Sequence, residues 1–288
     1  MNSGVRARCW GLLMCSLACG GLTGAAVAQS PAGAQSLLDD RWVFNLGAFV
    51  FGTEVKGRLD GQSLSNPEID FDKAFGKASD ATRVRGDALW RITPEHHLQF
   101  MYFNNSTTRS RVLEEDLHWG SYTFHSGSRA DFSHKFQALD LSYEYALVRR
   151  SNYEVAASAG VNYMDLTLQL SGTASVTDPQ GNTTAATAST KSSSLPAPLP
   201  VLGLRAGWLP ASDWYLVAQG QFFKAKVGRF DGYWSDLRIG ATWMFQRRLG
   251  VGLGYDRFLT NLDVSKSDFD GRLKLGYSGL RLYLVGTI

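Results

Sequence analysis

The residues of this chain that could do chemistry are five histidines and the hydroxyl and carboxyl groups near them. The histidines are His96, His97, His118, His125 and His134, and the groups near the last three are Asp116, Ser126, Ser128 and Asp131. Hydrolysis needs a nucleophile in direct contact with a base, and no sequence motif fixes such a contact here. The spacing of His118 and His125 also matches no common metal-ligand pattern. We therefore predict no catalytic residue, no metal site and no cofactor.

A second set of ionisable residues lies in segments where polar and apolar residues alternate. It contains six arginines and six carboxylates: Arg83, Arg85, Arg91, Arg205, Arg238, Arg281, Asp87, Asp140, Glu144, Glu154, Asp236 and Asp256. Buried charges destabilise a fold unless they are paired. Equal numbers of the two signs therefore predict a network of ion pairs that fills an enclosed lumen. The alternative is a narrow charged pore, in which the same side chains are hydrated.

The alternating segments are the elements that must position these charges. In 82–92, for example, Val84 and Trp90 share one parity, whereas Arg85 and Asp87 share the other. Strict alternation gives a strand one apolar and one polar face. Ten such segments follow one another, at about 41–54, 81–92, 96–108, 130–147, 153–170, 196–209, 214–226, 234–245, 249–265 and 271–288. No apolar run after the first 28 residues is long enough for a membrane helix.

The connections between these segments sort by length. Four are short, at 93–95, 149–152, 210–213 and 246–248, and they alternate with longer ones near 55–80, 109–128, 171–195, 227–233 and 267–271. Tight turns at one end and long loops at the other are typical of transmembrane barrels of the bacterial outer membrane. We therefore predict a closed antiparallel barrel of about ten strands, with eight or twelve as alternatives, and a first dozen mature residues that lie loose in the periplasm.

The start of the chain predicts export. Arg6 and Arg8 precede an apolar stretch at 9–22, and Ala26-Val27-Ala28 resembles a signal-peptidase site, so we predict a cleaved signal at 1–28 and a barrel at 29–288. All three cysteines lie within that signal, which leaves no disulfide in the mature chain. Only two of the 29 basic residues lie there, so the remainder nearly balances the 26 acidic residues. A balanced charge does not favour nucleic acid as a partner.

Aromatic residues next to the short turns, such as Trp208, Trp214 and Trp243, are typical of a girdle at a membrane interface. In 42–47, 250–255 and 280–285 the chain resembles small outer-membrane barrels of the outer-membrane-protein-W or surface-antigen type. The resemblance implies insertion by the barrel-assembly machinery, a monomer or loose oligomer, and no catalytic residue. The chain departs from that pattern by ending in Ile288 rather than in an aromatic residue.

The loops suggest a role at the bacterial surface. The segment 171–195 is rich in Ser, Thr, Ala and Gly, and we predict a mobile external loop there. Lys135, Lys224 and Lys226 lie above the apolar band, where they could pair with phosphates of lipopolysaccharide. We therefore predict a structural or surface-interaction barrel of the outer membrane. The alternatives are a narrow passive channel for small solutes or ions and, third, a lipid-modifying enzyme at the outer rim.

Overall fold

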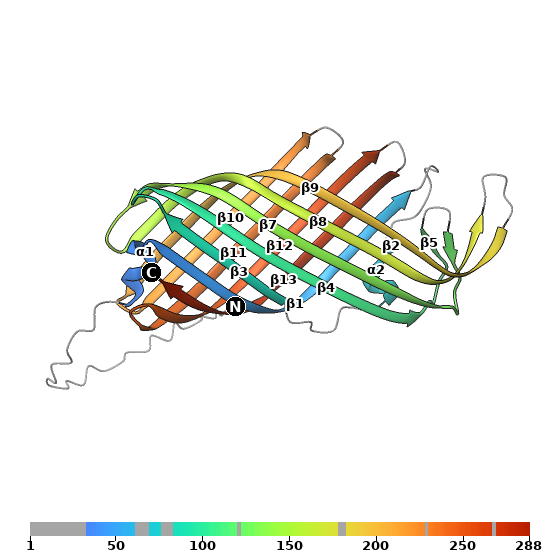
Figure 1. Ribbon diagram of the computed structural model, residues 1–288, viewed down its shortest axis with the longest axis horizontal. Helices are drawn as coiled ribbons and strands as arrows, with labels where there is room; N and C mark the ends of the chain where they lie inside the picture. The colour runs from blue at the N-terminus through green and yellow to red at the C-terminus, as the bar shows by residue number, and fades with distance from the viewer. Residues whose placement is uncertain are drawn as a thin grey trace, which may run out of the picture. The chain divides into compact units, whose positions relative to one another are not determined.

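A computed structural model of the chain describes residues 33–60, 69–75, 83–119, 122–177, 183–227, 230–266 and 269–288 (Figure 1). The predicted signal segment lies outside these residues. The helical elements are η1 (Gly33–Gln35), α1 (Ser36–Asp39) and α2 (Phe71–Phe75). The long strands are β1 (Trp42–Asp60), β3 (Arg83–Arg91), β4 (His96–Val112), β7 (Arg129–Arg149), β8 (Tyr153–Thr177), β9 (Thr183–Ala211), β10 (Trp214–Val227), β11 (Phe230–Gln246), β12 (Leu249–Lys266) and β13 (Phe269–Thr287). Three short strands accompany them: β2 (Ile69–Asp70), β5 (Leu117–Trp119) and β6 (Tyr122–Phe124).

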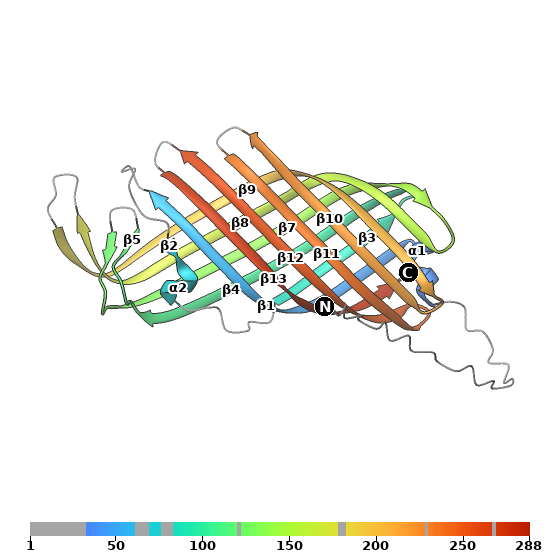
Figure 2. The same ribbon diagram turned by 180° about the vertical axis from the view of Figure 1, so that it is seen from behind.

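The ten long strands form a closed antiparallel barrel, which confirms the predicted fold class. Each strand pairs with its neighbour in the chain, β1 pairs with β13, and β8 pairs with β9. The two opposite views show both walls of this barrel, with every strand tilted across it (Figures 1 and 2). Closure gives each long strand a hydrogen-bonded neighbour on both sides, which is a requirement for strands that cross a membrane. Among the described residues, no helix is long and apolar enough to cross a membrane.

The two ends of the barrel differ as the connection lengths predict. At one end, called the turn end here, the links 92–95, 150–152, 212–213 and 247–248 join consecutive strands, and the backbone of Trp42 pairs with that of Ile288. The opposite end is called the loop end. There β5 and β6 form a hairpin, and β6 pairs with β8 through Tyr122 and Thr123.

The prediction of a mobile loop at 171–195 is wrong for the residues that the structure describes. Ser171 pairs with Thr190 and Thr177 with Thr183, so β8 and β9 continue as a hairpin beyond the last β7–β8 pair, Ala130 with Gly172. Composition misled because backbone hydrogen bonds between antiparallel strands need no buried core, and Thr favours extended backbone. The loop predicted at 227–233 is likewise shorter, because β10 and β11 extend into it.

The outward face of the strands is apolar. Leu46, Leu204, Leu237, Leu253 and Leu282 are between 48% and 62% exposed. Trp208, Trp214 and Trp243 are exposed near the turn end, as the predicted girdle requires. A continuous apolar surface of this kind on a monomer is stable only against another apolar phase. The outward face of the barrel is therefore suited to lipid.

Candidate functional site

The twelve charged residues predicted to face the lumen are all buried inside the barrel. They come from seven different strands: β3, β7, β8, β9, β11, β12 and β13. Alternation along each strand points them inward, because successive side chains lie on opposite faces. They do not form one continuous network. Most of them form two separate clusters, and three have other contacts.

The central cluster consists of Arg85, Asp87, Asp236, Arg238, Asp256 and Arg281. Asp87 lies 3.0 Å from Arg85 Nε, 3.1 Å from Arg238 Nη1 and 3.4 Å from Arg281 Nη1. Asp256 lies 3.4 Å from Arg85 and 3.3 Å from Arg281. Asp236 lies 3.3 Å from Arg238 Nε. Three arginines thus alternate with three carboxylates, so the cluster compensates its own charge in a space from which solvent is nearly excluded.

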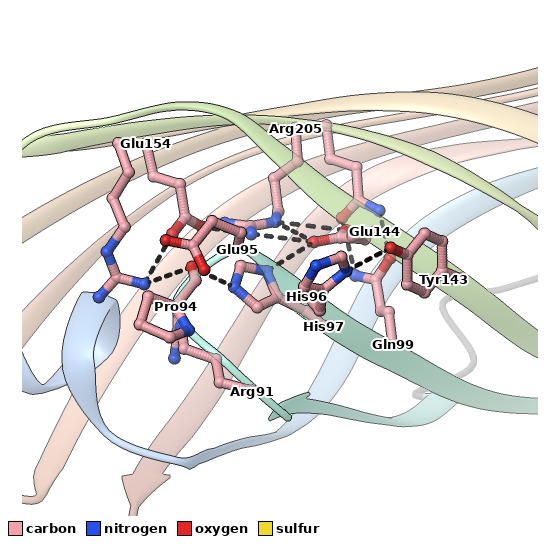
Figure 3. A network of polar contacts seen from close by, with 12 residues as sticks. Arg91, Pro94, Glu95, His96, His97, Gln99, Tyr143, Glu144, Glu154 and Arg205 are labelled. Carbon is pink, nitrogen blue, oxygen red and sulfur yellow. Dashed lines mark hydrogen bonds and ion pairs between the residues drawn. The ribbon is translucent and has the colours of Figure 1, made fainter.

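The second cluster, called the lower cluster, lies nearer the turn end (Figure 3). Arg205 lies between two glutamates, with Nη2 2.9 Å from Glu144 Oε2 and 2.6 Å from Glu154 Oε1 (Figure 3). His97 Nδ1 lies 3.8 Å from Glu144 Oε2, and His97 Nε2 lies 3.0 Å from the carbonyl oxygen of Pro94. Arg149 Nη1 lies 3.5 Å from Glu154 Oε2. The cluster ties β4, β7, β8 and β9 together across the lumen.

The other three predicted lumen charges contact neutral groups. Asp140 accepts a hydrogen bond of 2.8 Å from Ser142 Oγ. Arg83 donates to Thr107 Oγ1. Arg91 donates to the carbonyl oxygens of Leu37, at 2.7 Å, and Asp40, at 2.9 Å. The expectation of uniform charge pairing is therefore too simple, because backbone carbonyls and hydroxyls can also satisfy a guanidinium or a carboxylate.

The N-terminal segment 33–40 packs against the turn end, so the prediction of a loose periplasmic start is wrong for these residues. Leu37 and Leu38 are 3% and 1% exposed, and they join Val43, Tyr215 and Tyr283 in one apolar cluster. Arg91 holds this segment by the bonds described above. Arg149 Nη2 donates to the carbonyl oxygen of Leu38 and to Asp39 Oδ1, both at 2.8 Å.

The sequence analysis missed this packing of 33–40, called the plug below, because two leucines in a short polar stretch give no periodic pattern. A signal for it lies in the two arginines near the turns, which need hydrogen-bond acceptors. Arg91 and Arg149 flank short turns, and a guanidinium has more donors than one carboxylate can take, so backbone carbonyls of a nearby segment can accept the rest.

Between the two clusters the lumen contains a cavity of about 90 Å³. Asp87, Gln99, Arg205, Gln219 and Arg281 are among the side chains that line it. Gln99 and Gln219 exchange two hydrogen bonds, at 3.1 and 2.6 Å, across the lumen. Leu37, Val43 and Val217 line it as well, so it is a small, partly polar space between the two clusters that has room for water.

The half of the lumen towards the loop end is apolar, which the sequence analysis did not foresee. Inward-facing aromatic rings pack in sequence there: Phe49 on Phe103 at 5.8 Å, Phe103 on Tyr277 at 5.3 Å and Tyr277 on Phe258 at 4.9 Å between centroids. Phe71 of α2 stacks on Phe132 at 4.2 Å. Trp234 and Leu168 are each 1% exposed in the same core. The alternation analysis counted one apolar face per strand, whereas here both faces are apolar.

The rim lysines and the histidines occupy different environments. Lys135 and Lys224 are exposed, and the side chain of Lys226 lies outside the described residues. His134 is buried beside Asn105, at 3.4 Å, and His96 contacts the Tyr143 hydroxyl at 2.5 Å. In the described part of the chain, no three His, Cys, Asp or Glu side chains group closely enough to hold a metal ion.

Comparison with known proteins supports the fold. The barrel is similar to the outer membrane protease OmpT of Escherichia coli, with a TM-score of 0.57 and 13% identity over 87% of this chain and 97% of that one. Weaker matches include the toluene transporter TodX of Pseudomonas putida, with a TM-score of 0.33 and 10% identity over 90% and 93% of the two chains. Ail, the attachment invasion locus protein of Yersinia pestis, has a TM-score of 0.28 and 7% identity over 83% and 97%. No protein-family model and no curated protein sequence matches the chain. The chain therefore has the fold of a Gram-negative outer-membrane β-barrel.

Proposed function

We propose that this protein is a closed barrel of the bacterial outer membrane with a structural or surface-interaction role, and that it does not act as a pore. The observation that carries the proposal is the filling of the lumen along its length. The segment 33–40 covers the turn end, two ion-paired clusters occupy the middle, and an aromatic core with α2 fills the part towards the loop end. A barrel of about this size has an interior that side chains can fill.

The outer surface supports a location in a membrane with the loop end outside. The apolar outward face suits the lipid core, and short turns on such barrels face the periplasm. The exposed Lys135 and Lys224 then lie on outward parities, where lipopolysaccharide phosphates are the expected partners. Insertion then requires the barrel-assembly machinery, and we expect a monomer.

Conductance in a planar bilayer tests the closed lumen. The mature protein should give no stable single-channel steps. A variant that lacks 33–40 and carries Arg205→Ala should stay silent as well, because the central cluster and the aromatic core still close the lumen. The matched control is Arg150→Ala, which replaces an exposed arginine next to the turn at 150–152. Stable steps with the unmodified protein would instead support the channel alternative, for which the cavity of about 90 Å³ is the favourable observation.

A further inference from the structure

Three side chains at the loop end form a hydrogen-bonded chain of acid, imidazole and hydroxyl. His125 Nδ1 lies 3.3 Å from Asp116 Oδ2, and His125 Nε2 lies 2.8 Å from Ser175 Oγ. Asp116 precedes β5, His125 follows β6 and Ser175 lies on β8, 50 residues from the histidine. Contacts of this length among these three groups are the geometric requirement for nucleophilic catalysis by a serine.

A tight turn holds His125 in place. The backbone N–H of Ser128 donates to the His125 carbonyl oxygen at 3.1 Å, and Ser128 Oγ donates to the same oxygen at 2.5 Å. Gly127 has a φ of 80°, which suits the third position of a type II turn and favours glycine there. The Gly127 N–H donates to the Leu113 carbonyl oxygen, and this bond anchors the turn to the end of β4.

Strand pairing places Ser175 under the imidazole. Ser175 pairs with Thr123 where β6 continues the sheet beyond β7, so the strand register sets its position. Ser175 is 7% exposed, whereas the side chains of His125 and Asp116 are 55% and 46% exposed. The hydroxyl therefore lies against the sheet, and the base that would activate it faces solvent.

The acid determines which imidazole nitrogen carries the proton. The backbone N–H of Ser126 donates to Asp116 Oδ1 at 2.7 Å, and this bond, with the one from His125, lowers the pKa of Asp116. An ionised carboxylate can only accept hydrogen bonds, so His125 Nδ1 must be the donor. When the ring carries a single proton, Nε2 is an acceptor, and the Ser175 hydroxyl can donate to it at 2.8 Å, a shorter contact than its 3.5 Å to the Thr123 carbonyl oxygen. This is the tautomer that a general base needs.

We propose that Ser175, His125 and Asp116 form a hydrolytic triad that cleaves carboxylic esters at the loop end. This activity goes beyond the structural role and departs from the sequence-based expectation of no catalysis. Ser175 Oγ attacks the ester carbonyl carbon while its proton passes to His125 Nε2. The bond to the alcohol oxygen breaks, and the alcohol leaves with that proton. Water then attacks the acyl-serine, gives one proton to His125, and the acid departs as Ser175 regains its hydrogen.

Asp116 is a positioning residue in this scheme, because it orients the ring and stabilises the imidazolium that forms in both steps. The substrate is an acyl ester, either soluble or part of a membrane lipid. Both sources present the same carbonyl group, and the half-exposed ring of His125 leaves the site open to solvent.

Labelling with a fluorophosphonate, which phosphonylates activated serines, tests the triad on the mature barrel in detergent. Ser175 should carry the label, Ser175→Ala should carry none, and His125→Ala should label at least about 100-fold more slowly. Asp116→Asn should also slow labelling, and Asp116→Glu should restore part of it. Ser171→Ala, on the same strand, and His118→Ala, in the same hairpin, are matched controls that should keep the wild-type rate. Heat-modifiable gel mobility verifies that each variant folds.

A thiol variant tests whether His125 activates the side chain at position 175 or only contacts it. Ser175→Cys should react with iodoacetamide faster than Ser171→Cys, and His125→Ala should remove the difference.

Hydrolysis of p-nitrophenyl butyrate and of phosphatidylethanolamine in mixed micelles then distinguishes a soluble ester from a lipid ester. Turnover of either one that is lost in Ser175→Ala supports the proposal. Absence of turnover with both, or labelling that persists in Ser175→Ala, would overturn it, whatever the conductance of the barrel.

Discussion

Asp87 contacts three arginines of the central cluster, so its removal leaves that cluster with one uncompensated positive charge. Asp87→Ala should lower the free energy of unfolding by about 3–5 kcal/mol, the usual effect of breaking a buried ion pair. Urea unfolding in detergent or lipid measures this. Glu115→Ala is the control, because Glu115 is 81% exposed in its ion pair with Lys73 and should change stability by less than about 1 kcal/mol. Equal effects of the two variants would mean that the lumen is open to water.

Arg205 allows a sharper test, because its partners are known. Arg205→Met alone leaves Glu144 buried without an arginine partner and Glu154 with only Arg149, at 3.5 Å, and should destabilise by about 3–5 kcal/mol. The triple variant with Glu144→Gln and Glu154→Gln should recover much of that loss, because no charge remains unpaired. Unfolding of the single, double and triple variants completes the cycle. A triple variant less stable than Arg205→Met would show that size and packing, rather than charge, govern this site.

At the scale of elements, the segment 33–40 should behave as part of the folded barrel. Leu38 is 1% exposed, so Leu38→Ala should lower the free energy of unfolding by about 2 kcal/mol or more. Arg149→Ala should weaken the same segment by removing its bonds to Leu38 and Asp39. Limited proteolysis near residue 35 reports release of the segment. Arg248→Ala at another turn is the control. Cleavage of Arg149→Ala at the wild-type rate would show that Arg149 does not hold the segment 33–40 in place.

The hairpin of β8 and β9 provides a second prediction at this scale. Backbone amides in paired strands exchange with solvent only when the pairing opens. Amides in 171–172 and 189–195 should therefore exchange slowly, although 171–195 was expected to be a loop. Hydrogen–deuterium exchange with mass spectrometry measures this. The exposed turn at 150–152 is the fast-exchanging reference. Equal exchange rates in both regions would mean that the predicted loop at 171–195 is correct after all.

At the scale of the whole molecule, the outward surface should tolerate only apolar residues. Ala241→Arg should cost about 2–4 kcal/mol if it lies near the membrane midplane. Ser142→Arg should also destabilise the barrel, because Ser142 faces the lumen and is fully buried beside Asp140 and Gln221. Arg150→Ala, exposed at the turn end, is the neutral reference. Folding yields into lipid vesicles, followed by heat-modifiable mobility, separate these cases, and normal yields for Ala241→Arg would contradict the membrane-facing surface.

The sequence by itself determined the barrel, its ten strands, the alternation of connection lengths and the inward face of all twelve charges. Each of these follows from local pattern, because a period of two fixes which face a side chain occupies. Only the tertiary structure decided which charges meet, since partners such as Arg85 and Asp256 are 171 residues apart and depend on register and closure. The same holds for the plug at 33–40 and for the contact of His125 with Ser175. Neither contact has a local pattern, because each joins segments that only the closed sheet brings together.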